Sequence, residues 1–368
     1  MPATISVYES FDAIPDAVRS ALSFPGQPNF FLSLDWFELL QTTAMADTVR
    51  PRIYVLGDTD GGVQAALFCC RPQRAGRREL RSLSNFYTIE FDVSVVGAGM
   101  SPALARETLV RHIASESPRW DTVNMALART EASGQPGFAQ ALALNGFAAH
   151  PYFQYENWTH ATQGQRFDAY YQERPSQVRN TIQRRQKKLD KAHRSEITVT
   201  RGVDAGLDDA VEAFCKVYNA SWKEPEPFPA FIPGLIRCAA RLGVLRLGVL
   251  RVDGQAAAAQ LWINASGRAV IYKLAYDEKY AEFGVGSILS RELFRIALDE
   301  DAVEVIDYGV GSEAYKKDWM SSVQPLVGTE AFNRSSVVGL ALGMAEASKQ
   351  RLRLLRRAFQ ARAGLSKA

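Results

Sequence analysis

The sequence has few of the residues from which metal sites and disulfide frameworks are built. It contains four cysteines and four histidines in 368 residues. The cysteines show no metal-type spacing, and the adjacent Cys69 and Cys70 are not expected to pair with each other. We therefore expect reduced, mostly buried thiols. The histidines form no metal-binding pattern, so no metal site is expected, although a single catalytic histidine is not excluded.

Targeting signals and a strong charge of one sign are also missing. The start, MPATISVYESFDAIP, has acids where a secretion signal has a basic segment, and it lacks an apolar core. No apolar run approaches the roughly 18 residues that span a bilayer. The formal net charge is +3, so composition alone indicates no nucleic-acid or membrane partner. A cytoplasmic location without a transmembrane segment is expected.

What is present is the composition of an ordinary globular chain, 47% hydrophobic and 23% charged. A chain of this length is expected to form two domains, each with its own core. We predict a first domain over residues 1–165, a second over 166–340 and a basic helical tail over 341–368. The tail has seven basic residues and no acid after Glu346.

The first half alternates helix and strand patterns. A helix is predicted over 30–44, where Trp36, Leu39 and Leu40 recur at i, i+3 and i+4. β-branched or apolar runs closed by Gly, Asp or Pro predict strands. The remaining predictions are strands over 52–58, 63–72, 91–97 and 122–128, a helix over 103–115, and a closing pair of strands within 145–160.

The second half repeats this order, which favours a duplicated mixed α/β fold with a central sheet in each half. A helix is predicted over 206–222, followed by strands whose connections VDGQ and ASGR are hairpin-type turns. These strands should therefore be antiparallel. The unit over 269–308, a strand, a helix and another strand, is long enough for a parallel crossover.

Two glycines, Gly284 and Gly286, stand one residue apart where the strand gives way to the helix. A helix N-terminus exposes unpaired N–H groups and about half a unit of positive charge. Glycines there let a pyrophosphate approach the main chain closely. We predict a phosphate cradle at the amides of residues 284–288; the alternative is a tight turn with no ligand.

Six blocks in the second half carry a family resemblance. They are RNTIQRRQKKL (179–189), SWK (221–223), AAQLW (258–262), YKLAYDEKY (272–280), GVGSIL (284–289) and IDYGVGSEAYKKDW (306–319). Over residues 171–339 the sequence resembles the GNAT (acyl-CoA N-acyltransferase) fold, and within it the FemAB-like branch, also described as CelD/BioF-like acetyltransferases. Two tandem domains of this type are then expected.

The resemblance implies a binding mode for the acyl donor, acetyl-CoA or another acyl-CoA. Two parallel strands, here 269–276 and 303–308, would splay apart and admit the pantetheine arm, and the pyrophosphate would rest on the glycine turn. The implied donor-binding residues are Leu274, Gly284, Val285, Gly286 and Ser287. Ala281 stands where the family has a basic or amide residue, which is a departure from the pattern.

Acyl transfer to an amine needs a base, a donor for the oxyanion and an acid for the leaving thiolate. Asp307, at a strand end, is the predicted base. Tyr315 and Lys316 are predicted to supply the acid and the oxyanion contact, with Tyr276 as a further catalytic candidate. The acceptor side is predicted to involve Trp222, Lys223 and Glu224. Each of these residues also has a structural interpretation, as a loop anchor, a packed aromatic ring or a solvated charge.

Between the halves lies a basic segment, with a helix predicted over Arg179–Lys191. It is either a solvated connector or a polyanion site for the 3′-phosphate of coenzyme A, an anionic acceptor or tRNA. The function expected is acyl, most simply acetyl, transfer to a primary amine of a small molecule or sugar precursor. The alternatives are an aminoacyl-tRNA-dependent Fem-type ligase, although the chain lacks the long helical hairpin arm of several such ligases, and a non-catalytic subunit of a polysaccharide or envelope pathway.

Overall fold

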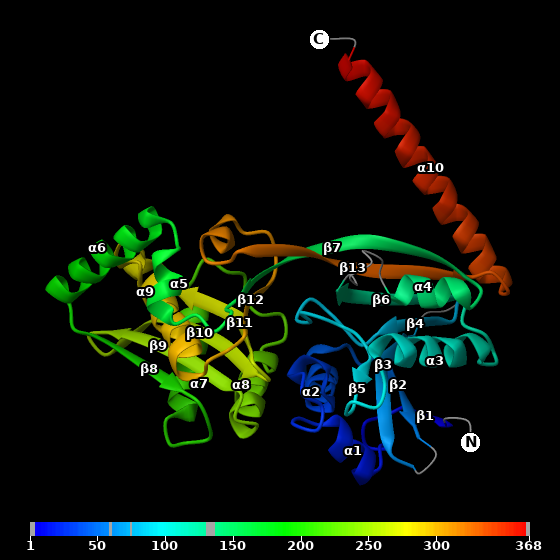
Figure 1. Ribbon diagram of the computed structural model, residues 1–368, viewed down its shortest axis with the longest axis horizontal. Coiled ribbons are helices and arrows are strands. Elements are labelled where there is room, and N and C mark those ends of the chain that lie inside the picture. Colours follow the sequence, from blue (N-terminus) through cyan, green and yellow to red (C-terminus); the bar gives the residue numbers. More distant parts are fainter. Residues whose placement is uncertain (1–3, 59–60, 74–75, 130–136, 366–368) are drawn as a thin grey trace. The chain divides into compact units, whose positions relative to one another are not determined.

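The computed structural model describes residues 4–58, 61–73, 76–129 and 137–365, and it contains two compact units (Figure 1). The first comprises Met1–Leu22, Ala46–Gln154 and Leu326–Ala368; the second comprises Ser23–Met45 and Tyr155–Pro325. These units differ from the contiguous ranges 1–165 and 166–340. The segment Ser23–Met45 packs with the second unit, and the chain returns to the first at Leu326.

The first unit is a sheet flanked by helices. Its strands follow the order β1-β2-β3-β4-β6-β13, with β5 paired to β3. The strands are β1 (Thr4–Tyr8), β2 (Val49–Gly57), β3 (Val63–Pro72), β4 (Glu79–Ser82), β5 (Ser94–Val95), β6 (Thr122–Arg129) and β13 (Ser322–Asn333), and the helices are α1 (Asp16–Leu22), α3 (Pro102–Ser115), α4 (Gly137–Leu144) and α10 (Val337–Leu365). The predicted tail helix falls within α10, except for residues 366–368, which lie outside the described residues.

Strand β7 (Phe147–Ala161) corrects one prediction, because a pair of strands was expected within residues 145–160. The segment is one strand of 15 residues. A tight hairpin needs residues that adopt positive φ. The nearest glycine, Gly146 with φ 87°, precedes the strand, and no glycine follows within it.

The second unit is also a mixed sheet, in the order β7-β12-β11-β10-β9-β8. Its other elements are β8 (Ser195–Thr200), β9 (Leu245–Val252), β10 (Gln255–Ala265), β11 (Arg268–Tyr276), β12 (Val305–Val310), α2 (Leu34–Ala44), α5 (Phe167–Gln172), α6 (Ser176–Ala192), α7 (Leu207–Asn219), α8 (Phe231–Arg241), α9 (Val285–Arg295) and the short turns η1 (Phe30–Leu32), η2 (Glu278–Phe283), η3 (Ile296–Glu300) and η4 (Ala314–Asp318).

The turns of this sheet confirm the predicted strand directions. β9–β10 and β10–β11 are antiparallel, and β11–β12 is parallel. At the first hairpin Asp253 and Gly254 have φ of 49° and 79°; at the second, Ser266 and Gly267 have 47° and 76°. Two consecutive residues with positive φ are the signature of the type I′ turn, whose twist matches that of paired strands.

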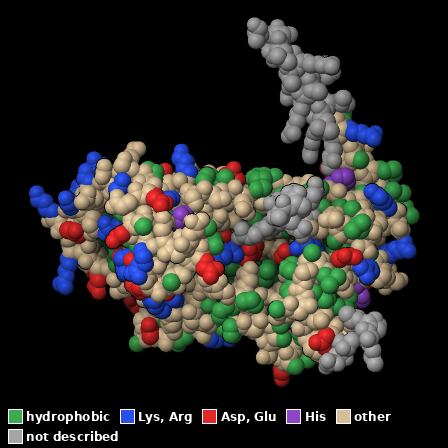
Figure 2. Space-filling model, in the orientation of Figure 1, with side chains coloured by type: hydrophobic (Ala, Val, Ile, Leu, Met, Phe, Trp, Pro, Cys, Tyr) green, Lys and Arg blue, Asp and Glu red, His purple; other side chains and the backbone are tan. Residues whose placement is uncertain are grey.

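The basic helix α6 confirms the helix predicted over Arg179–Lys191. Ile182 and Leu189 are its buried residues, so the helix packs through a narrow apolar stripe. The basic side chains Arg184, Lys187 and Lys191 are exposed. In Figure 2 basic side chains gather at the end of the molecule where Figure 1 places α6.

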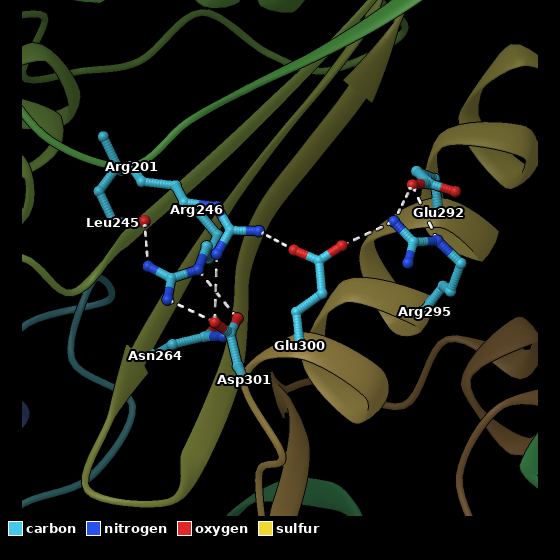
Figure 3. A network of polar contacts seen from close by, with 8 residues as sticks. All are labelled: Arg201, Leu245, Arg246, Asn264, Glu292, Arg295, Glu300 and Asp301. Atoms are coloured by element: carbon cyan, nitrogen blue, oxygen red, sulfur yellow. Dashed lines mark hydrogen bonds and ion pairs between the residues drawn. The ribbon is translucent and has the colours of Figure 1, made fainter. Parts of the chain in front are cut away.

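A polar network holds the end of α9 to the sheet (Figure 3). After α9 the helix widens into the π-helical turn η3, and Asp301 follows. The Asp301 carboxylate accepts two hydrogen bonds from Arg246, at 2.6 and 2.9 Å, and one from Asn264 at 2.7 Å. The Glu300 carboxylate accepts a hydrogen bond from Arg295 at 2.8 Å through one oxygen and another from Arg201 through the other oxygen. The bidentate Arg–Asp pair therefore fixes the helix end to β9 and β10.

Asp301→Ala is expected to lower the free energy of unfolding by about 3 kcal/mol. The Asp301 side chain is only 10% exposed and that of Arg246 only 15%. The substitution therefore leaves a largely buried guanidinium without its carboxylate. Urea denaturation measures the loss. Glu300→Gln is the control: its carboxylate is 38% exposed, and an exposed pair contributes about 0–1 kcal/mol. Equal losses in the two variants would contradict the structural role assigned to Asp301.

None of the helices in the described part of the chain is both long enough and apolar enough to cross a membrane.

Candidate active site

Strands β11 and β12 part from each other within the second unit. Their parallel ladder joins Arg268–Val270 to Val305–Asp307 and extends no further between these two described strands. β11 continues to Tyr276 and β12 to Val310. At the parting point Gly309 has φ 65°, and the pairing of β12 with β7 shifts register between Asp307 and Val310. A bulge of this kind bends a strand away from its neighbour.

The start of α9 lies just beyond β11. Gly284 adopts the left-handed conformation, φ 63° and ψ 36°, which ends η2 and begins α9. Its carbonyl accepts from the amides of Ser287 and Ile288, at 3.0 and 3.1 Å, and its own amide donates to Ala281. Of the amides at 284–288, those of Val285 and Gly286 have no acceptor among the described residues. The turn therefore offers an anion two N–H groups, fewer than the five amides predicted over residues 284–288.

Gly286 is constrained by packing rather than by its backbone angles. A Cβ atom there would lie 3.2 Å from Cδ1 of Tyr276, and the Gly286 carbonyl accepts from Gln260 at 2.9 Å. Any side chain at this position would press on the Tyr276 ring at the end of β11. Glycine therefore keeps the first turn of α9 close to the strand.

Arg185 of α6 supplies a cation at the start of α9. A Cβ atom on Gly284 would lie 2.5 Å from Cδ of Arg185 and 2.9 Å from its Nη1, so the side chain runs directly over this glycine. The next turn of α6 is held by an ion pair between Lys188 and Glu282. Ala281 leaves a gap in the phosphate pattern, and Arg185, a member of the predicted basic helix over Arg179–Lys191, provides a cation at the glycine turn. Arg185 precedes Gly284 by about one hundred residues in the sequence. Only the folded structure shows that the two residues are neighbours.

Asp307, predicted to be the base, is fully buried at 0% exposure. Its Oδ1 accepts from Asn157 and from the amide of Gly309, both at 2.7 Å, and its Oδ2 accepts from Arg268 at 2.6 Å. A buried carboxylate with both oxygens in use holds a structure together more readily than it accepts a substrate proton. These contacts favour the structural interpretation: Asp307 anchors β12 to β7 and β11 where the strands part.

The Lys316 ammonium is also occupied by polar contacts within the protein, whereas Tyr315 is partly exposed. The buried Lys316 ammonium donates to the carbonyl of Val310 at 2.7 Å and pairs with Glu313 at 2.8 Å. It therefore shapes the loop after β12 instead of presenting a donor to an oxyanion. Tyr315 is 43% exposed and packs edge-on against Tyr308 at 5.6 Å. Burial, with the Glu313 charge, raises the pKa of Tyr315 to about 12, so the phenol is protonated at neutral pH.

Comparisons with known proteins identify the family of this region. The family model described as an acetyltransferase (GNAT) domain matches residues 176–317. These residues, called the GNAT domain after that match, make up most of the second unit. The crystal structure of FemX matches with a TM-score of 0.58 at 10% identity, over 86% of this chain and 94% of that one. No curated protein matches the chain in sequence.

Two further solved structures share the fold. A tandem GNAT protein from the clavulanic acid biosynthesis pathway has a TM-score of 0.50 at 13% identity, over 90% of this chain and all of that one. The structure of L-PGS from Bacillus licheniformis has 0.51 at 12% identity, over 89% and 97%. The predicted mixed α/β fold with two GNAT-like units is thus confirmed at the level of the fold, and a GNAT domain in general takes an acyl-CoA co-substrate.

The GNAT domain brings the predicted acceptor residues to the end of β11. The Trp222 ring lies 4.7 Å from that of Tyr276, and the Lys223 ammonium lies 5.7 Å from the Trp222 ring centre. Glu224 is exposed in the same loop. Leu274 lies on β11 beyond its last pair with β12, beside the place where the arm of a donor is predicted to enter.

Two carboxylates that the sequence analysis did not single out belong to this part of the GNAT domain. Glu226 pairs with Lys273 of β11, and Glu313 follows the loop after β12. Burial alone would raise the pKa of Glu313, but the hydrogen bond from Lys316 and the nearby lysine charges outweigh it and lower the pKa. Glu226 follows SWK by only three residues, yet nothing in its sequence context distinguishes it from a surface acid.

A separate apolar hollow lies in the same unit as the GNAT domain. It encloses about 200 Å³ and is lined by Phe30, Phe31, Ile263 and Val270, with Arg268 at one side. Arg268 and Val270 are in the first part of β11, whereas Tyr276 ends the strand. We infer the donor site from the parted strands β11 and β12 and from the start of α9. The hollow is therefore not assigned to donor binding. Among the residues described, no group of three or more metal-ligating side chains was found.

Proposed function

We propose that this protein transfers an acyl group, most simply acetyl, from acyl-CoA to a primary amine on a small molecule or sugar precursor. One observation carries the proposal: within the GNAT domain the β11–β12 ladder stops at Val270, and the far end of β11 leads to a helix start with two unused amides and Arg185. Such a helix start attracts an anion through its main chain and its dipole. The parted strand edge offers main-chain groups to an extended arm.

Each residue then has a chemical task. The Val285 and Gly286 amides and the Arg185 guanidinium bind the donor's pyrophosphate, and the free edge of β11 around Leu274 orients its arm. Glu313, a carboxylate at neutral pH, accepts the proton of the amine through water while the amine attacks the thioester carbon. The C–N bond forms, the C–S bond breaks, and Tyr315 gives its proton to the leaving thiolate. Asp307 and Lys316 hold the strand and loop that carry these groups.

Arg185→Met is expected to weaken coenzyme A binding about tenfold, because the pyrophosphate loses one charge-assisted hydrogen bond, which contributes about 1.5–3 kcal/mol. Titration calorimetry measures the affinity. Lys187→Met is the matched control, since it removes the same charge from an exposed position on the same helix. A loss of the same size in both variants would indicate diffuse attraction to α6, and no loss in either would remove Arg185 from the donor site.

The exposed basic face of α6 favours a second candidate, aminoacyl transfer from a tRNA. Arg184, Lys187 and Lys191 have no carboxylate partner among the described residues, and their charges would give phosphate binding that weakens steeply with salt. Under the first proposal, protein purified at low salt carries no tRNA and binds acetyl-CoA. Under the second, it retains tRNA and acetyl-CoA binding is absent. Failure to bind either donor would support a non-catalytic subunit. A cytoplasmic location fits both enzymatic proposals.

A further inference from the structure

Three lysines and two glutamates meet beside the end of β11. Lys273 pairs with Glu226, and Lys316 pairs with Glu313 at 2.8 Å. Each carboxylate is thus matched by one ammonium group. Lys223 is the third lysine, and it leaves the cluster with one positive charge in excess. An excess charge that is partly removed from water is unfavourable until an anion joins it.

The Lys223 ammonium is held in place by aromatic rings rather than by an acid. It lies 5.7 Å from the ring centres of both Tyr218 and Trp222. In the part of the chain that the structure describes, it forms no ion pair with a carboxylate. Tyr218 also carries Lys273, whose ammonium lies 5.1 Å from the same ring. The rings therefore fix two cations side by side.

The surroundings weaken the charged form of Lys223. Burial, followed by repulsion from Lys273, lowers the pKa of Lys223 to about 8, although Glu313 and Glu226 act in the opposite direction. The ordinary value is 10.5. An anion placed against this ammonium would stabilise the charged form and raise the pKa of Lys223 again.

We propose that Lys223 binds an anionic group, a carboxylate or a phosphate, on the amine acceptor and so determines acceptor specificity. The inference rests on the proposed function, because it takes the end of β11 to be the acceptor side. Trp222 and Tyr276 bring Lys223 to that end, and Lys223 is close enough to feel the charge of Glu313, in the loop that carries Tyr315. The acceptor class is then a zwitterionic amine, such as an amino acid or an amino-sugar phosphate, rather than a simple amine.

The test is a direct titration of the Lys223 ammonium that needs no turnover. The lysines of the full chain are reductively methylated with ¹³C, which keeps their charge, and the Lys223 signal is identified by its loss in Lys223→Arg. Sodium acetate and inorganic phosphate are added separately at constant ionic strength. The exposed Lys187 and Lys191, identified in the same way, are the internal controls.

We expect a saturable shift of the Lys223 signal with at least one anion, and a pKa that rises from about 8 toward 10.5 when the anion is bound. Saturation by acetate alone indicates a carboxylate, and saturation by phosphate alone indicates a phosphate. A response no larger than that of Lys187 and Lys191 would overturn the proposal. So would a shift that disappears when desulfo-coenzyme A is present, because the anion would then occupy the donor's site.

Failure of this inference is separable from failure of the proposed function. If acetyl-CoA does not bind in calorimetry but the Lys223 signal still saturates, the anion site stands and the acyl donor is wrong. If acetyl-CoA binds and Lys223 does not respond, the donor site stands and the acceptor is not held by this lysine. Lys223→Met removes the saturable site in the first case without altering the controls.

Discussion

Gly286→Glu is expected to weaken coenzyme A binding about 100-fold. The new carboxylate would stand in the first turn of α9, against amides and a guanidinium that the donor's pyrophosphate needs. Like charges about 4 Å apart near a protein surface repel by a few kcal/mol, and about 2.7 kcal/mol corresponds to 100-fold in affinity. The side chain would also press on Tyr276, since a Cβ there lies 3.2 Å from its ring.

Titration calorimetry measures the affinity, and thermal unfolding shows whether the variant is folded like the parent. Gly286→Gln is the matched control, because it adds the same bulk without the charge. Gly286→Gln should weaken coenzyme A binding only through the added bulk. The loss of affinity should therefore be well below that in Gly286→Glu. Unchanged affinity in a folded Gly286→Glu protein would show that the start of α9 is not the phosphate cradle.

Asp307→Asn is expected to lower the free energy of unfolding by about 3–5 kcal/mol, the cost of breaking a buried ion pair from one side. The Arg268 side chain is 20% exposed and loses its carboxylate partner. Because an amide nitrogen replaces one carboxylate oxygen, either Arg268 or the donors of Asn157 and Gly309 must face another donor. β12 would then lose its anchor at the point where it leaves β11.

This result distinguishes an anchor from a base. If Asp307 anchors the strand, urea denaturation shows the loss of stability, and turnover per folded molecule falls to a similar extent at every pH. The control Asp190→Asn changes an exposed carboxylate on α6 and should leave stability within about 0.5 kcal/mol. A variant as stable as the parent, with turnover depressed most at low pH, would restore Asp307 as the base predicted from the sequence.

The elements that the sequence revealed are those with strong local signals. The two hairpin turns needed residues tolerant of positive φ, and Asp253–Gly254 and Ser266–Gly267 provide them. Helix α6 carried its apolar stripe at Ile182 and Leu189 within an otherwise charged segment. Helix α8 was missed because Pro233 stands in its first turns and resembles a loop signal. The pairing of Ser322–Asn333 in the sheet was missed because it depends on strand β6, far away in sequence.

Within the candidate site, too, features with a local sequence signal were predictable, and those that depend on distant contacts were not. The glycine turn was recognisable because a strand, two glycines and a helix follow each other directly. Asp307 was predicted at a strand end but lies within β12, at the last pair with β11, and its role depends on Asn157 and Arg268, which lie on other strands. The basic helix with Arg185 was recognised only as a whole, and Glu226 was missed because nothing in its neighbourhood distinguishes it from a surface charge. Such residues acquire a function only through the contacts that the fold brings to them.

The most direct test of the acyl-CoA site is a crystal structure of the protein with acetyl-CoA. We expect the pyrophosphate on the amides of Val285 and Gly286, with the Arg185 guanidinium within hydrogen-bond distance, and the pantetheine arm along the edge of β11 that is unpaired with β12 beyond Val270. The thioester carbon should then face Tyr315. A donor bound in any other place, with the start of α9 unoccupied, would contradict the account.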